Sequence, residues 1–297
     1  MITSRYAGVI ERIESGGRVL IDGATGTECE RRGVPQVMNT WNSGAALSHP
    51  EIVREIHQDY IDCGAEIIIT NTFSSSRHAM RSAGIEDRFE ALTRAAVRVA
   101  REAREHCDRP EVLIAGGITH WIWTQEKPSL EELEANTRDQ AMLMAEEGCD
   151  LIMLEMLSDI DRLLACIDGA VASGLPVWAG ISLEPIEGWM CLLNGETLED
   201  TLAALEGRDV PLINIMHTEV KYVDAVLDVL QQNWNGAIGV YAHNCEFFDD
   251  GRVSFDNTIS PEEYRDAAER WLERGVQVIG GCCGVRREHI CALQSIV

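Results

Sequence analysis

The chain has 297 residues, and 45% of them are hydrophobic, which is enough for a large buried core. Acidic residues outnumber basic ones by 49 to 25, for a net charge of −24, and no basic cluster stands out; partners such as nucleic acid or an anionic membrane are therefore not expected. The sequence contains no apolar run of about 18 residues and no apolar secretory core near its start, so we expect a cytoplasmic protein without a membrane span. The ten cysteines are then expected to be reduced thiols.

Short apolar segments alternate along the chain with longer segments that read as helices. The strand candidates are residues 18–21, 66–69, 112–115, 151–154, 177–181, 212–215, 237–240 and 276–279. Each is almost continuously apolar, as parallel strands buried on both faces should be. Ser129 and Ser260 are each followed by Glu three residues later, which predicts helix starts, while Gly64, Gly148 and Gly275 predict helix ends.

Eight strands that alternate with helices favour an α/β fold with a parallel sheet. Eight is also the number of strands that closes a (β/α)₈ barrel, the TIM-type fold. We therefore predict a single barrel domain over residues 1–297, with a doubly wound open sheet as the alternative.

Two adjacent cysteines, Cys282 and Cys283, follow the last predicted strand within a glycine-rich run. Neighbouring cysteines can hardly form an unstrained disulfide, whereas two thiolates can bind one soft or borderline metal ion. The alternative is two small buried side chains at the end of a core strand. His217, after the sixth strand, and Cys245, after the seventh, are both candidates for a third zinc ligand, because zinc accepts nitrogen and sulfur alike.

Other polar and aromatic residues gather at the same strand ends, where barrels of this kind carry their active sites. Glu155 directly follows a buried apolar run, so its carboxylate needs a partner, and a substrate ammonium group would be one. Trp41, Trp121 and Trp123 lie in loops after the first and third strands. They either pack within those loops or offer an aromatic face to a cationic methyl donor. A thiol substrate in the fourth position of the zinc site would be a thiolate and a good nucleophile.

Three segments, residues 22–27, 70–73 and 280–284, resemble signatures of the homocysteine S-methyltransferase family. This family includes methyltransferases that use betaine or S-methylmethionine as the methyl donor. The resemblance extends over about residues 20–293. It implies a zinc-dependent enzyme that moves a methyl group from a sulfonium or quaternary ammonium donor to homocysteine, giving methionine. Its partners would be the small thiol acceptor and the donor, and a homo-oligomer is left open.

The resemblance also implies roles for individual residues. Cys282 and Cys283 match the paired zinc ligands, Asp22, Gly23 and Thr70 match the homocysteine pocket, Glu155 matches the residue that binds the amino group, and Trp41 matches an aromatic near the donor.

One position departs from the family pattern. Met216-His217 stands where the family has an Asn-Cys pair whose cysteine binds zinc. We expect His217 to replace that cysteine; otherwise Cys245 supplies the third ligand, or the site is degraded. The alternative functions are methylation of another small thiol, or a non-catalytic barrel that binds zinc and thiols.

Overall fold

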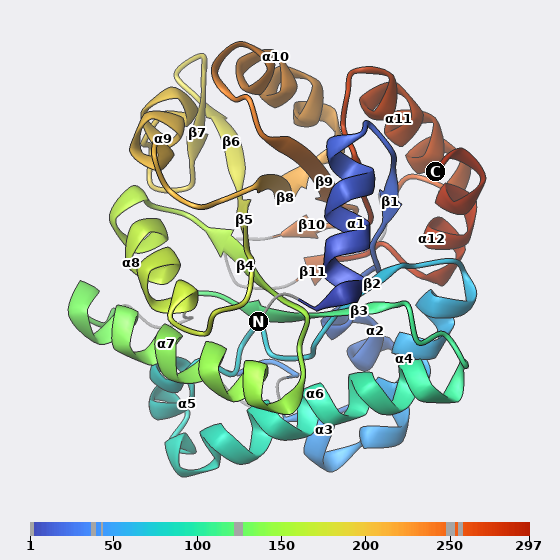
Figure 1. Cartoon of the computed structure of the whole chain (residues 1–297), viewed down its shortest axis with the longest axis vertical. Helices are drawn as coiled ribbons and strands as arrows, with labels where there is room; N and C mark the ends of the chain where they lie inside the picture. The colour runs from blue at the N-terminus through green and yellow to red at the C-terminus, as the bar shows by residue number, and fades with distance from the viewer. Residues whose placement is uncertain (1–2, 37–39, 43, 122–126, 248–252, 255–257) are drawn as a thin grey trace.

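The computed structural model describes residues 3–36, 40–42, 44–121, 127–247, 253–254 and 258–297, and its centre is a parallel barrel (Figure 1). The barrel strands are β1 (Val19–Leu20), β2 (Ile67–Ile69), β3 (Leu113–Ile118), β4 (Leu151–Leu157), β5 (Val177–Ile181), β8 (Leu212–Glu219), β9 (Ala237–His243) and β12 (Val278–Ile279). They pair in the order β1-β12-β9-β8-β5-β4-β3-β2, and a bridge between Ile21 and Ile67 joins the first strand to the second. The predicted barrel and its eight strand positions are confirmed, whereas the one-domain interpretation stays a prediction.

Helices surround the barrel and pack on the outward faces of its strands (Figure 1). The longer ones are α4 (Pro50–Asp62), α6 (Phe89–His106), α7 (Leu130–Glu147), α8 (Ile160–Val171), α9 (Leu198–Leu205), α10 (Val223–Asn233), α11 (Pro261–Glu273) and α12 (Arg287–Leu293). Shorter ones are α2 (Gly26–Arg31), α3 (Ala45–Ser48), α5 (Arg77–Ser82), η1 (Glu86–Arg88), η2 (Val220–Tyr222) and η3 (Gln294–Ile296). Ser129 and Ser260 cap α7 and α11 as predicted, and Gly148 ends α7 in a left-handed conformation.

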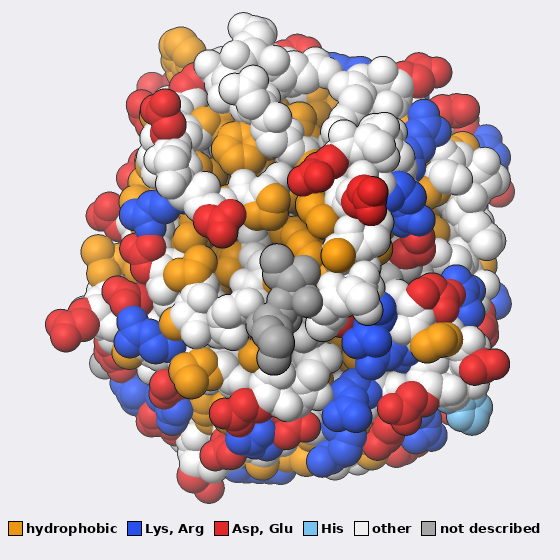
Figure 2. Space-filling model, in the orientation of Figure 1, with side chains coloured by type: hydrophobic (Ala, Val, Ile, Leu, Met, Phe, Trp, Pro, Cys, Tyr) orange, Lys and Arg blue, Asp and Glu red, His pale blue; other side chains and the backbone are white. Residues whose placement is uncertain are grey.

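An N-terminal helix that the sequence analysis did not assign, α1 (Ser4–Glu14), lies across one mouth of the barrel (Figure 1). Tyr6, Val9 and Ile13 on this helix are buried in the apolar cluster that fills the barrel interior. The Trp178 indole N–H donates to the Tyr6 hydroxyl at 3.0 Å. Figure 2 shows this face, with hydrophobic side chains near its centre and charged ones around them. The helix therefore closes the barrel at the N-terminal ends of its strands.

Asp150, just before β4, fixes this closure. Its side chain is fully buried. It accepts hydrogen bonds from Thr3 Oγ1 at 2.9 Å and from the Ile114 backbone N–H at 3.0 Å. Arg5 and Arg104 pair with its two oxygens at 3.0 and 3.3 Å. A buried carboxylate is stable only when it is paired and hydrogen-bonded, and Asp150 meets both conditions.

Two β-hairpins were not predicted. One joins β6 (Leu183–Ile186) to β7 (Trp189–Leu192), and the other joins β10 (Glu246–Phe247) to β11 (Val253–Ser254). No helix within the described ranges is long and apolar enough to cross a membrane.

The expectation of ten reduced thiols is wrong for one pair. Cys63 at the end of α4 and Cys291 in α12 form a disulfide. The two residues are 228 positions apart in the sequence, so only the packing of the C-terminal helix beside α4 brings them together. The other eight cysteines, including Cys245, Cys282 and Cys283, are free thiols.

Candidate functional site

Three potential metal donors meet at the C-terminal mouth of the barrel. In the described part of the chain, ligand atoms of His217, Cys282 and Cys283 all lie within 4.8 Å of one another. The Cys282 sulfur is 4.0 Å from Nδ1 of His217 and 3.9 Å from the Cys283 sulfur. Contact with the Cys283 thiol is the first cause that raises the pKa of Cys282 well above its usual range, followed by burial. Neighbouring thiols of this kind resist ionisation unless a cation joins them.

Cys245, the other candidate ligand, lies beside the cluster. Its thiol contacts that of Cys283 and raises the pKa of the latter. Cys245 is buried, with 8% of its surface exposed, but it is not part of the 4.8 Å group. The arrangement leaves Cys245 as a neighbour of the cluster and puts His217 inside it.

Two strand irregularities lie close to the cluster, one of them at His217. The pairing of β8 with β9 gains one residue between Met216 and Glu219, where His217 has a left-handed φ of 46°. The pairing of β4 with β5 gains one after Leu154, where Met156 has a φ of 53°. The two bulges touch, because the Met156 backbone N–H donates to the Met216 sulfur at 3.0 Å. Bulges re-aim side chains beside active sites, and such φ values cost about 1–3 kcal/mol each.

Two carboxyl groups, Asp22 and Glu155, are buried near the cluster without an ion pair in the described part of the structure. Burial raises the pKa of Glu155 to about 8, although the nearby Tyr241 hydroxyl opposes this. Burial also raises the pKa of Asp22 well above its usual range, and the nearby charge of Glu155 adds to the increase, while the Ile69 backbone N–H, which donates to Asp22 at 2.8 Å, opposes it. Both groups therefore favour a cationic partner that the described chain does not supply.

Two glycines and a threonine lie close to the strand ends that carry these carboxyls. Gly117 in β3 allows Glu155 to approach, since a Cβ at Gly117 would lie 2.7 Å from Oε2 of Glu155. The Thr70 hydroxyl accepts from the Gly117 N–H at 3.2 Å. Gly23 lies instead against the loop after β12, where a Cβ would be 2.6 Å from the Val285 carbonyl oxygen. Thr70 therefore lies beside the Glu155 region, and Gly23 lets the first and last strand loops pack together.

Two of the three tryptophans that were expected to face a methyl donor lie within the described residues. Trp41 is half-buried, has a left-handed φ of 44°, and its ring would be 3.5 Å from a Cβ placed at Gly26. Trp121 is also half-buried and packs against the apolar cluster of the barrel interior, as Phe73 and Cys282 do. Trp123 lies outside the described residues.

Two residues on β9, to which the sequence patterns assigned no role, also border the site. Tyr241 is buried, and its hydroxyl lowers the pKa of Glu155. His243 packs its ring against that of His217, with centroids 5.0 Å apart. A signal was present, because positions 241 and 243 share one face at the end of a predicted strand, and both carry polar groups.

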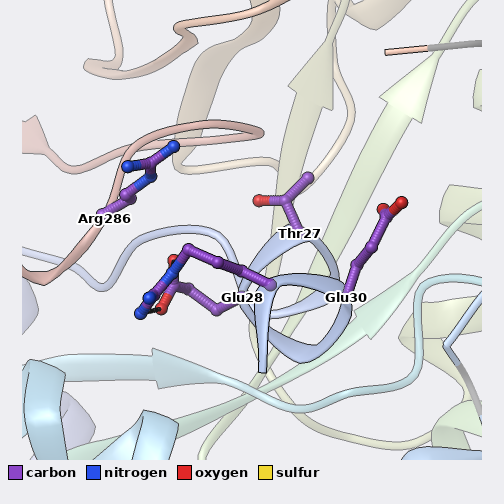
Figure 3. Close-up of a pocket in the computed structure, with 5 residues that line it drawn as sticks. Thr27, Glu28, Glu30 and Arg286 are labelled. Atoms are coloured by element: carbon purple, nitrogen blue, oxygen red, sulfur yellow. Dashed lines mark hydrogen bonds and ion pairs between the residues drawn. The ribbon is translucent and has the colours of Figure 1, made fainter. Parts of the chain in front are cut away.

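A separate small pocket of about 150 Å³ lies at α2 (Figure 3). Its lining residues are Thr27, Glu28, Glu30, Arg31 and Arg286. The Thr27 hydroxyl accepts from the Gly284 N–H at 3.3 Å, which ties this pocket to the loop that carries the two cysteines. Glu28 is already paired with Arg31, so the pocket offers no uncompensated charge from that residue.

Comparisons with known proteins identify the family and support the fold. Residues 19–297 match the family model described as homocysteine S-methyltransferase. The homocysteine S-methyltransferase YbgG of Bacillus subtilis is 25% identical over 292 residues, covering 92% of both chains. The selenocysteine Se-methyltransferase of Brassica oleracea var. italica is also 25% identical, covering 95% of this chain and 89% of its own. The homocysteine methyltransferase MmuM from Escherichia coli, in its metallated form, has the same fold, with a TM-score of 0.80 at 24% identity and coverage of 96% and 98%. The match over residues 19–297 means that the chain belongs to the homocysteine S-methyltransferase family.

Proposed function

We propose that this protein is a zinc-dependent methyltransferase that converts homocysteine to methionine with an onium methyl donor. The observation that carries the proposal is the meeting of two thiols and an imidazole beside two buried carboxyls at the C-terminal mouth. Soft and borderline donors suit a metal that activates a thiol, and the carboxyls suit the ammonium group of an amino acid.

The donor set fits zinc in number, type and spacing. A tetrahedral zinc ion with bonds of about 2.0 Å to nitrogen and about 2.3 Å to sulfur places its ligand atoms roughly 3.5–3.8 Å apart. The separations of 3.9 and 4.0 Å around Cys282 need only a small adjustment to reach this range. His217, Cys282 and Cys283 would hold the ion and leave one position open. When bound there, zinc holds the acceptor sulfur as a thiolate at neutral pH.

Protein side chains then orient the acceptor. Glu155 and Asp22 bind its ammonium group, whose positive charge restores both carboxyls to the ionised form that burial disfavours. Thr70 borders the same space through its bond to Gly117. The Tyr241 hydroxyl lies near Glu155 and favours the ionised form of its carboxylate. Catalysis by these residues is a matter of position, because a thiolate needs no further base.

The donor binds on the aromatic side of the mouth. Trp41 and Trp121 are both half-buried, and their rings would attract a positively charged sulfonium or quaternary ammonium group. In the reaction the acceptor sulfur forms a bond to the methyl carbon while the bond between that carbon and the onium atom breaks. The bonding pair stays with the donor, which leaves as a neutral sulfide or amine.

A donor panel tests the proposal. Zinc-loaded protein is incubated with homocysteine and one deuterated methyl donor at a time: S-methylmethionine, glycine betaine or a simple dialkyl sulfonium. We expect at least one donor to give methionine that carries the label, detected by mass spectrometry. The Cys282→Ala variant is the control and should give none. Zinc-loaded wild-type protein that forms no labelled methionine with any donor would contradict the proposal and favour a non-catalytic thiol-binding role.

A second acceptor class is worth including in the same assay. Because one relative is a selenocysteine Se-methyltransferase, a selenol or another small thiol is the alternative substrate. Homocysteine, cysteine and selenocysteine are compared with the best donor. Selective turnover of homocysteine supports the first proposal, and selective turnover of either of the others replaces it.

A further inference from the structure

His217 occupies a backbone conformation that needs support. Its φ of 46° lies in the left-handed region, at the bulge where β8 has one residue more than β9. The residues on either side are held by other parts of the barrel. The Met216 sulfur accepts from Met156 N–H at 3.0 Å, and Thr218 Oγ1 accepts from Leu183 N–H at 3.0 Å. These two hydrogen bonds hold the residues on either side of His217, but they do not orient its imidazole ring.

His243 contacts His217 in two ways. The rings pack at a centroid distance of 5.0 Å and an interplanar angle of 53°. The His243 imidazole also makes a polar contact with the backbone of His217. Only 9% of the His243 surface is exposed, so β9 holds its ring in place. One buried side chain therefore restrains both the left-handed backbone and the ring plane of His217.

We propose that His243 is a positioning residue that presents His217 to the metal; the inference rests on the proposed function, because it requires zinc at this site. Nδ1 of His217 already faces Cys282 at 4.0 Å. Holding the ring in that direction before the ion arrives removes the entropy cost of ordering it on binding. Residues that orient a metal ligand typically change metal affinity by about 10–100-fold when they are replaced.

Zinc affinity, measured by competition with a chromophoric chelator, tests the proposal without an activity assay. His243→Phe keeps a ring but removes the N–H donor, and we expect zinc to bind about 10–100-fold more weakly. His243→Gln keeps an N–H donor and should lose less affinity than His243→Phe. The absorption spectrum of the cobalt-substituted protein should shift in His243→Phe as the nitrogen ligand loosens, while the sulfur-to-cobalt bands remain. If the phenylalanine variant fails to fold, His243→Leu takes its place.

A double-mutant comparison separates positioning from general damage. In a His217→Ala background, His243→Phe should cause no further loss of zinc affinity, because there is no imidazole left to orient. His57→Phe is the matched control, since His57 is fully buried in α4 and neither ring nitrogen has a partner in the described structure. It should leave zinc affinity unchanged.

Unaltered zinc affinity in His243→Phe, or an equal loss with and without His217, would overturn the positioning role while the proposed function stands. Wild-type protein that binds no zinc would overturn both.

Discussion

The two mouths of the barrel each contain buried carboxyl groups, and the chain treats them in opposite ways. At the N-terminal mouth, Asp150 is surrounded by two arginines, a threonine hydroxyl and a backbone N–H. At the C-terminal mouth, Asp22 and Glu155 have no cation in the described structure, and burial raises the pKa of both. The fold thus supplies the partners of one buried carboxyl, whereas under the proposed function the ammonium group of the acceptor supplies the partner of the other two.

The largest effect is expected from the cysteine pair. Cys282→Ala and Cys283→Ala each remove one of two sulfur donors, so zinc content should fall to near zero and methyl transfer should become undetectable. Elemental analysis of the purified variants gives the first quantity and methionine formation the second. Cys29→Ala, at a buried thiol of α2, is the control. Full zinc retention by both site variants would remove the cysteine pair from the metal site.

Asp150→Ala tests the structural mouth. Removing the carboxylate leaves Arg5 and Arg104 without their buried partner, and breaking a buried pair typically costs about 3–5 kcal/mol. Urea unfolding should show this loss, whereas kcat/KM per folded molecule should not change. Asp139→Ala removes an exposed partner of Arg77 and should cost about 1 kcal/mol or less. Equal losses in the two variants would mean that the Asp150 network does not stabilise the closure.

The pH dependence of stability tests the functional mouth. Below about pH 4.5 Glu155 is protonated whether the protein is folded or unfolded. Between that pH and about 8 it is ionised only in the unfolded chain, so stability is lost as pH rises through this window. Each pKa unit corresponds to roughly 1.4 kcal/mol, so Glu155→Gln should avoid a loss of a few kcal/mol in the free energy of unfolding. Without acceptor, the wild type and Glu155→Gln should therefore have nearly equal melting temperatures at pH 5. At pH 8.5 the melting temperature of the variant should be the higher one. Parallel curves would argue against a raised Glu155 pKa.

Glu155 should also determine how tightly homocysteine binds. Glu155→Ala removes a charge-assisted contact worth about 1.5–3 kcal/mol, which raises the KM for homocysteine roughly 10–100-fold. Zinc content should stay near the wild-type value. Steady-state kinetics at saturating donor measure the first, and an unchanged homocysteine KM would separate Glu155 from the amino group.

The smallest effect is expected at Trp41. A cation–π contact at a partly exposed ring contributes about 0.5–1 kcal/mol, so Trp41→Leu should raise the donor KM by roughly two- to fivefold. The homocysteine KM should not change. Trp189→Leu, at an exposed indole on the β6–β7 hairpin, is the control. A larger change in the acceptor KM than in the donor KM would mean that Trp41 contacts the acceptor and not the donor.

The parts that sequence patterns predicted are those set by local chemistry. The eight strands could be predicted because each is buried on both faces. The capping box of Ser260 and Glu263 predicted the start of α11. The adjacency of Cys282 and Cys283 alone predicted a metal site, which the structure leaves as a proposal. Long-range contacts were not visible: the Tyr6–Trp178 hydrogen bond that seats α1 joins residues 172 positions apart. A helix over residues 4–14 could still have been predicted from the spacing of Tyr6, Val9 and Ile13 after the capping residue Thr3.

Site geometry depended on register, which the sequence patterns did not reveal. The left-handed conformations of Met156 and His217 arise where one strand gains a residue on its neighbour. Nothing in either local sequence signals that gain, since neither position is a glycine. The contact between His243 and His217 follows from the same pairing and was missed for the same reason.

The closure of the barrel has a consequence for synthesis of the chain. β1 pairs with β12, whereas a single bridge between Ile21 and Ile67 joins it to the second strand. During translation the first strand must therefore wait for nearly the whole chain to emerge before its main partner exists. Cys282 and Cys283 follow directly after that partner strand. The last step that completes the ring of strands thus also delivers the two thiols, so a prematurely terminated chain would lack both the closed barrel and the cysteines proposed to bind zinc.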